Sequence, residues 1–182
     1  MNKRQKGFTL IELLIVVAII LIIAAIAIPN LLRSKMAANE AAAVGAVRTT
    51  VTAQVTYYST YNTGYATSFT ALSGPAGATA SWGQALLLDP TFNAAVPAKQ
   101  GYNFGLAGAN PPATVPATAV NGVDDQTFDT IASAITLGTT GQRSFCDDQS
   151  GAIMYDATGG VKYTASAGAS CSADGFTTAM GQ

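Results

Sequence analysis

Glu12 is the residue whose surroundings most require a partner of opposite charge, because it is the only charged residue between Phe8 and Leu32. A carboxylate within a membrane helix costs about 2.5–3.5 kcal/mol on insertion scales, and charged residues in such segments are usually functional. Pairing with an ammonium group in a low-dielectric helix bundle recovers part of that cost. The pattern predicts an ion-pair role for Glu12 where this helix packs against another.

The composition argues against catalysis. The chain contains no His, the commonest acid–base group in enzymes. The acid pairs Asp124-Asp125 and Asp147-Asp148 are candidates for calcium, but the second pair fails the Asp-x-Asx-x-Asx-Gly spacing. Both pairs are interpreted as solvated turns, and no glycine-rich phosphate loop or zinc spacing occurs. We expect no enzyme, no metal and no cofactor.

Two cysteines, Cys146 and Cys171, enclose a loop near the C-terminus. In an exported domain an even number of cysteines favours a disulfide over a nucleophile. Closing a loop of this size stabilises a fold by about 3 kcal/mol in the chain-entropy model. We expect this bridge, and the alternative is a pair of unrelated free thiols.

The element that positions Glu12 is the apolar run of residues 8–32. As a helix it rises about 37 Å, enough to cross a hydrocarbon layer of about 30 Å. Three basic residues, Lys3, Arg4 and Lys6, precede it and should hold that end in the cytoplasm. A secretory signal peptide has an apolar core of only roughly 7–15 residues. A plain single-pass anchor leaves Glu12 unexplained, and the basic flank argues against a buried core helix.

The motif around Glu12 is similar to a known one. Residues 7–12, Gly-Phe-Thr-Leu-Ile-Glu behind a basic leader, resemble the processing motif of type IV prepilins. The resemblance is close over about residues 3–33. It implies that a membrane-embedded aspartic prepilin peptidase cuts between Gly7 and Phe8 and N-methylates Phe8. It also implies that Glu12 pairs with the Phe8 amine of a neighbouring subunit during filament assembly, and that Pro29 is the helix-kinking proline of pilins.

The same resemblance implies partners and a location. The partners are copies of the chain in a helical homopolymer, the prepilin peptidase, an inner-membrane assembly platform, membrane lipid before assembly, and other minor pilins. The chain would lie in the inner membrane before assembly and in an extracellular filament afterwards. Without the leader it has six basic and ten acidic residues, a formal charge of −4, which gives no indication of nucleic-acid binding.

The expected fold is the α+β type IV pilin fold, a long N-terminal helix packed on a C-terminal antiparallel sheet of about four strands. The expected parts are a leader (1–7), the long helix (8–61, with 8–32 as transmembrane span and filament core) and a globular head (62–182). Within the head we expect an αβ loop (62–100), the sheet (101–165) and a disulfide-closed region (146–182).

The second half of the helix has a pattern of its own. Apolar residues recur there at steps of three and four, which is typical of an amphipathic helix. The face predicted to pack on the sheet comprises Ala41, Val44, Val47, Val51, Val55 and Tyr58. Pro29 should bend the helix near residues 25–28. Residues 62–64 are a predicted stop, and residues 86–90 are expected to end a short helix or turn.

Alternation and turn residues predict the strands. Residues 101–106 alternate as a half-buried strand, and residues 127–137 favour a strand. Residues 143–146 and 152–155 flank a hairpin loop. The proline-rich residues 109–121 are expected to form a loop, and residues 161–163 a further short strand.

The leading hypothesis is a structural one: a type IV pilin that polymerises through its N-terminal helix into a surface filament, for adhesion, twitching motility, DNA uptake or biofilm formation. One alternative is a pseudopilin of type II secretion, although the major pseudopilins of that family usually have a calcium loop and no disulfide. Another is a membrane-tethered binding module that never polymerises, for which Glu12→Ala would leave function intact.

Overall fold

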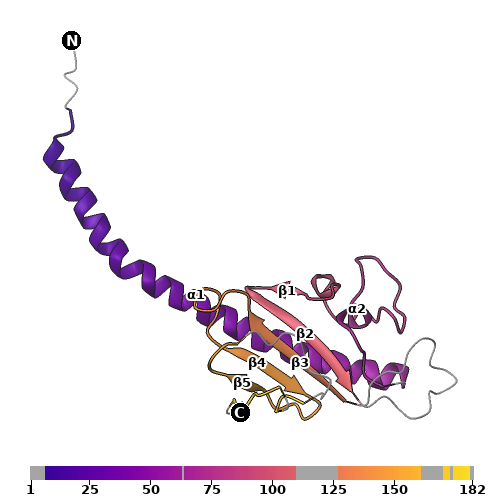
Figure 1. Ribbon diagram of the computed structural model, residues 1–182. Coiled ribbons are helices and arrows are strands. Elements are labelled where there is room, and N and C mark those ends of the chain that lie inside the picture. The colour runs from indigo at the N-terminus through magenta and orange to yellow at the C-terminus, as the bar shows by residue number, and fades with distance from the viewer. Residues whose placement is uncertain (1–6, 63, 110–126, 161–169, 173, 181–182) are drawn as a thin grey trace. The chain divides into compact units, whose positions relative to one another are not determined.

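The computed structural model describes residues 7–62, 64–109, 127–160, 170–172 and 174–180. By contacts along the chain it divides into two compact units, Met1–Lys35 and Met36–Gln182. The order of elements is helix first and sheet afterwards, which confirms the α+β class (Figure 1). The predicted strand at residues 161–163, residues 110–121 of the predicted loop, and Asp124-Asp125 lie outside the described residues.

A single helix, α1 (Leu10–Tyr61), runs through both units. Pro29 lies inside it, where the missing N–H removes one backbone hydrogen bond. The expected bend at this proline stays a prediction. The helix ends after Tyr61 because Asn62 adopts the left-handed conformation, with φ 53°, and donates its N–H to the Tyr58 carbonyl at 2.9 Å. The predicted stop at residues 62–64 is confirmed.

The face of α1 that packs on the sheet differs from the predicted one. Its buried residues are Glu40, Ala43, Val47, Thr50, Ala53, Gln54 and Tyr57. Of the predicted face, Val47 is buried, whereas Val55 and Tyr58 are 55% and 41% exposed. The prediction assumed that polar residues face solvent. Polar residues can be buried here because their hydrogen bonds are made within the fold.

Gln54 shows how the buried face is satisfied. Its amide nitrogen donates to the Ala66 carbonyl at 2.9 Å, and its amide oxygen accepts from the Ala66 N–H at 2.8 Å. The Gln54 side chain therefore satisfies both the N–H and the carbonyl of Ala66, in the segment that follows the helix. Thr50 donates its hydroxyl to the Ala46 carbonyl one turn earlier, at 3.0 Å. A pattern of apolar residues alone does not reveal such positions.

The sheet has six antiparallel strands in the order in which they occur along the chain. They are β1 (Ala98–Lys99), β2 (Tyr102–Ala109), β3 (Thr127–Ala134), β4 (Ser144–Asp148), β5 (Met154–Asp156) and β6 (Thr178–Ala179). The expected number of about four is corrected to six, because β1 and β6 have two residues each and are too short to leave a pattern of alternation. The predicted hairpin is confirmed as β4 and β5.

The two faces of the sheet are covered differently. Ala132 of β3 and Phe145 of β4 are paired in register and belong to the main core, together with Tyr57 of α1. Figure 1 shows the second half of α1 crossing behind these strands. Ile131 and Cys146, also paired in register, have the opposite parity and form a second cluster with Cys171 and Phe176. Side chains that alternate along β3 therefore contribute to two buried clusters, one on each face of the sheet.

The connection between α1 and the sheet packs on the main core. It contains a short helix, α2 (Phe69–Leu72), and a 3-10 helix, η1 (Pro90–Phe92). Phe92 lies 5.4 Å from the ring of Phe69 and 5.3 Å from that of Phe104, between ring centroids. Residues 86–90 were predicted to end a short helix or turn. Instead, the 3-10 helix η1 begins at Pro90. Asp89 accepts from the Thr91 N–H at 2.8 Å, and Pro90 occupies the first helical position.

Candidate assembly site at the start of the long helix

Thr9 and Glu12 form a capping box at the first turn of α1 (Leu10–Tyr61). The Glu12 carboxylate Oε2 accepts from the Thr9 N–H at 2.9 Å and from the Thr9 hydroxyl at 2.6 Å. The Thr9 hydroxyl in turn accepts from the Glu12 N–H at 3.3 Å. In such a box the two side chains satisfy backbone donors that the helix leaves without partners. Thr9 is a residue of this site that the sequence analysis did not single out.

The capping box leaves part of the carboxylate available. Among the described residues, the hydrogen bonds that the Glu12 carboxylate accepts are both made to Oε2. A carboxylate has about four lone-pair sites on two oxygens. The second oxygen, Oε1, can accept from a donor outside the chain while the box stays closed.

The residues before and after the capping box are exposed. Gly7 and Phe8 precede the helix without regular structure, and Phe8 is 80% exposed. A Cβ on Gly7 would meet nothing within 4 Å, so packing within the chain does not explain a glycine at this position. Of the described helices, α1 is long and apolar enough to cross a membrane, judged by length and composition. Its large side chains from Leu10 to Leu32 are mostly more than half exposed.

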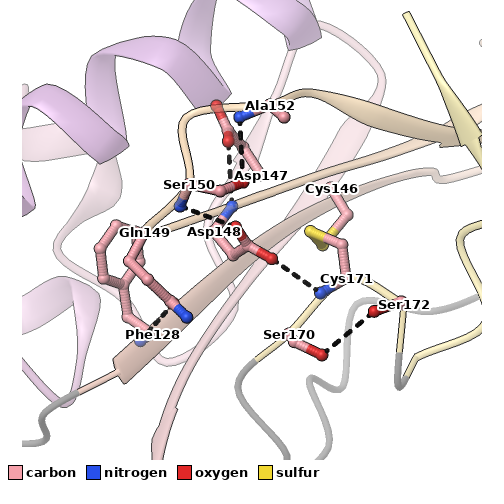
Figure 2. The surroundings of a disulfide bond; sticks show 10 residues. All are labelled: Phe128, Cys146, Asp147, Asp148, Gln149, Ser150, Ala152, Ser170, Cys171 and Ser172. Atoms are coloured by element: carbon pink, nitrogen blue, oxygen red, sulfur yellow. Dashed lines mark hydrogen bonds between the residues drawn. A yellow bond between two sulfur atoms is a disulfide. The ribbon is translucent and has the colours of Figure 1, made fainter.

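The predicted disulfide between Cys146 and Cys171 is confirmed. The two Cα atoms lie 5.6 Å apart, and the half-cystines are separated by 25 positions in sequence. Both are fully buried against Ile131 and Phe176. Figure 2 shows the bridge connecting β4 to a segment near the C-terminus, beside the carboxylate of Asp148.

Asp147 and Asp148 are buried, so their interpretation as a solvated turn is wrong. They end β4, where Asp148 accepts from the Ser150 N–H at 2.8 Å and from the Cys171 N–H at 3.3 Å (Figure 2). Asp147 accepts from the Asp148 N–H at 2.9 Å. Burial raises the pKa of Asp147 to about 6, and the charge of Asp148 acts in the same direction, while the Asp148 N–H and Arg48 oppose the shift.

A partly buried ion pair, with Glu40 buried and the Arg143 side chain 40% exposed, joins the second half of α1 to the connection between β3 and β4. Glu40 Oε2 accepts from Arg143 Nη2 at 2.6 Å and from Nε at 2.9 Å, a bidentate pair. Glu40 Oε1 accepts from the Gln142 N–H at 2.8 Å and the Arg143 N–H at 3.3 Å. The preceding residue, Asn39, donates to the Thr140 carbonyl at 2.9 Å. The sequence analysis missed this contact.

The comparisons with known proteins concern mainly the N-terminal part. Residues 2–28 match the prokaryotic N-terminal methylation motif. The chain is 48% identical over 58 residues to the type IV major pilin protein PilA of Myxococcus xanthus, which is 32% of this chain and 26% of the relative. It is 63% identical over 38 residues to the type IV wide pilus major component PilA4 of Thermus thermophilus, which is 21% of this chain and 29% of the relative.

A third relative comes from another system. The chain is 34% identical over 68 residues to the type II secretion system core protein G of Dickeya chrysanthemi, which is 37% of this chain and 44% of the relative. The chain therefore covers less than half of the length of each of these three relatives. No solved structure matches.

The N-terminal part of the chain therefore carries a prokaryotic methylation motif and is similar to type IV pilus components, and the structure has a long helix packed on an antiparallel sheet. The relatives include two pilus components and one component of a secretion system.

Proposed function

We propose that the protein is a structural subunit of a type IV pilus, cleaved between Gly7 and Phe8, N-methylated at Phe8 and polymerised through the first part of α1 (Leu10–Tyr61). The observation that carries the proposal is the methylation motif over residues 2–28, with Glu12 in the first turn of an exposed apolar helix. The length and composition of that helix support insertion in a membrane before assembly.

The geometry at Gly7 supports cleavage at that position. Packing against the described residues does not require a glycine at position 7, since a Cβ there would meet nothing within 4 Å. A small residue is therefore explained by a partner that must approach the backbone closely. The bond between Gly7 and Phe8 is outside α1 and exposed, as a peptidase substrate requires.

The geometry at Glu12 supports assembly by charge pairing. Cleavage would create an ammonium group at Phe8, four residues before the carboxylate. Oε2 is engaged by Thr9 and the capping box fixes the orientation of the side chain, which leaves Oε1 for the ammonium of a neighbouring subunit. Exposed apolar side chains on all sides of the helix, among them Leu14, Ile19 and Ile26, would then pack against copies of the same helix.

A second candidate function is a subunit of the type II secretion system. The identity to core protein G of Dickeya chrysanthemi extends over 68 residues and so reaches further than the methylation motif. The disulfide between Cys146 and Cys171 favours the pilus over this alternative, because the major pseudopilins of type II secretion usually have no disulfide.

The test is electron microscopy of material sheared from the cell surface, combined with mass analysis of the N-terminus. Fibres built of a chain that begins at methylated Phe8 are expected for a pilus. If a strain without this gene still makes fibres but fails to secrete exoproteins, the secretion alternative is established. A membrane-bound chain that retains Gly7 would contradict both.

A further inference from the structure

Asp129 is a fully buried acidic side chain of the sheet. It lies on β3 (Thr127–Ala134), is fully buried, and neither carboxyl oxygen has a hydrogen-bond donor within the described residues. Its parity along β3 is that of Ile131, so it lies on the face of the sheet that carries the disulfide. An ionised carboxylate without donors is costly to bury, so this position favours the protonated form.

A second carboxyl group lies beside it. Asp174, in the segment that follows Cys171, is within hydrogen-bonding reach of the Asp129 side chain. Two carboxyl groups can form a hydrogen bond only if one of them carries the proton. Burial raises the pKa of Asp129 to about 8, and the hydrogen bond and charge of Asp174 act in the same direction.

The other neighbours of Asp129 reinforce this preference. Asp148 is opposite it on β4, and its negative charge also raises the Asp129 pKa. On β2 the opposite residue is Ala107, which carries no charge. No Lys or Arg of the described residues contributes to the Asp129 pKa, and Arg48 acts on Asp147 instead. Lys162 lies outside the described residues.

The pair joins β3 to the end of the chain. We define the C-terminal segment as residues 170–172 and 174–180. Its attachments include the Cys146–Cys171 bridge, the Cys171 N–H donated to Asp148, and the buried ring of Phe176. Its last part, β6, pairs with β5 over two residues, and the Met180 N–H donates to the Ile153 carbonyl at 2.8 Å. Asp174 lies between Cys171 and β6 in the sequence.

We propose that Asp129 and Asp174 share one proton across the interface of β3 and the C-terminal segment, and that loss of this proton above neutral pH loosens the segment from the sheet. Between the ordinary pKa of an aspartate and the raised one, the folded state binds more protons than the unfolded state. Stability therefore falls as pH rises through this window and stays constant below it. This inference does not depend on the proposed function.

The test uses the full chain in detergent micelles, as wild type, Asp129→Asn and Asp147→Asn. The neutral amide in Asp129→Asn replaces the protonated carboxyl group and needs no proton. In the wild type, amide protection in the C-terminal segment should fall by up to about a hundredfold between pH 6 and pH 8 and level off towards pH 9, after correction for intrinsic exchange, because each pH unit inside this window corresponds to a factor of ten. In Asp129→Asn this fall should be absent.

The control Asp147→Asn removes a buried acid on the other face of the sheet, so it should keep the wild-type fall in protection. If Asp129→Asn does not fold, Asp174→Asn serves in its place, with the same expectation. A wild-type fall that persists in the Asn variant, or the failure of both Asn variants to fold at pH 5.5, would overturn the proposal.

Calcium chloride at pH 9 gives a further outcome. The described residues contain no group of three or more acidic, His or Cys side chains arranged to hold a metal ion, so added calcium should leave the protection of the segment unchanged. If calcium restores the protection in the wild type and not in Asp129→Asn, the pair is a cation site and the proton-sharing proposal is wrong.

Discussion

The two carboxylate oxygens of Glu12 have different surroundings. One oxygen closes the capping box with Thr9, which makes the carboxylate part of the helix start, and the other is directed to no donor among the described residues. A substitution at this position therefore changes both the helix end and any contact between subunits. The two effects differ in size, since a lost cap costs about 1 kcal/mol and an ion pair in low dielectric more.

We predict that Glu12→Gln reduces surface filaments about tenfold or more while the chain remains in the membrane. A glutamine keeps the capping geometry but not the negative charge, and 1.4 kcal/mol of lost pairing is a factor of ten. The measurement is the ratio of sheared to cell-bound protein by immunoblot. Asp89→Asn, an exposed charge removal at the start of η1, is the matched control and should assemble normally. Normal filament yield in Glu12→Gln would contradict the assembly role.

Among elements, the contact between α1 and the β3–β4 connection depends most on one side chain. Glu40 accepts four hydrogen bonds from two consecutive residues, Gln142 and Arg143. The Arg143 guanidinium also lies 5.6 Å from the ring centroid of Phe145 and 5.5 Å from that of Tyr155. The two rings restrict the Arg143 side chain, so forming the ion pair with Glu40 costs little further side-chain entropy.

We predict that Glu40→Ala destabilises the globular unit by about 2–4 kcal/mol, because it leaves two backbone N–H groups and a guanidinium without their acceptor. Glu40→Gln should cost less, since its amide oxygen still accepts. Chemical denaturation followed by circular dichroism measures both. Stability of both variants equal to that of the wild type would show that the contact of Glu40 with Gln142 and Arg143 has no energetic role.

The disulfide is the other element-scale constraint. We predict that Cys146→Ser combined with Cys171→Ser lowers the free energy of unfolding by about 3 kcal/mol, since the bridge closes a 25-position loop. Thermal unfolding with and without reductant measures this effect, and the reduced wild type serves as the internal control. A double variant with the stability of the oxidised wild type would be inconsistent with a structural role for the bridge.

Much of this architecture is visible in the sequence, and the exceptions have a physical reason. The apolar run, the stop at Asn62 and the alternation along β3 are local patterns. The ion pair of Glu40 with Arg143 joins positions 103 apart, so no local pattern indicates it. The buried face of α1 was mispredicted because Thr50 and Gln54 satisfy their polar atoms inside the fold. The burial of Asp147 and Asp148 was mispredicted because the contact of Asp148 with the Cys171 N–H joins positions 23 apart, which no local pattern indicates.

At the scale of the whole molecule, the stable core lies in one of the two units. All residues of the two buried clusters belong to Met36–Gln182, and the first cluster begins at Ala43. In contrast, the large side chains between Leu10 and Leu32 are exposed. The free energy of folding is therefore generated by the second unit, while the first requires lipid or other helices to cover its surface.

We predict that a chain restricted to Met36–Gln182 folds in the absence of detergent as a monomer with a cooperative thermal transition. Its removed part contributes no buried core residue, and Glu40 and Asn39 are retained. Analytical ultracentrifugation and calorimetry measure the outcome. The chain Phe8–Gln182, studied in the same buffer, should aggregate unless detergent is added. A fragment that is unfolded would show that the first part of α1 is needed for folding.

The two outermost strands have a further consequence. β1 and β6 offer only two residues each for pairing, and Lys99 stands on the first of these borders. If many copies were held side by side at high local concentration, the edge strands of their sheets would meet. A long unpaired edge strand is a template for amyloid-like stacking. Two-residue outer strands offer little backbone for pairing with a neighbouring sheet, so ordered packing between copies would depend mainly on the apolar part of α1.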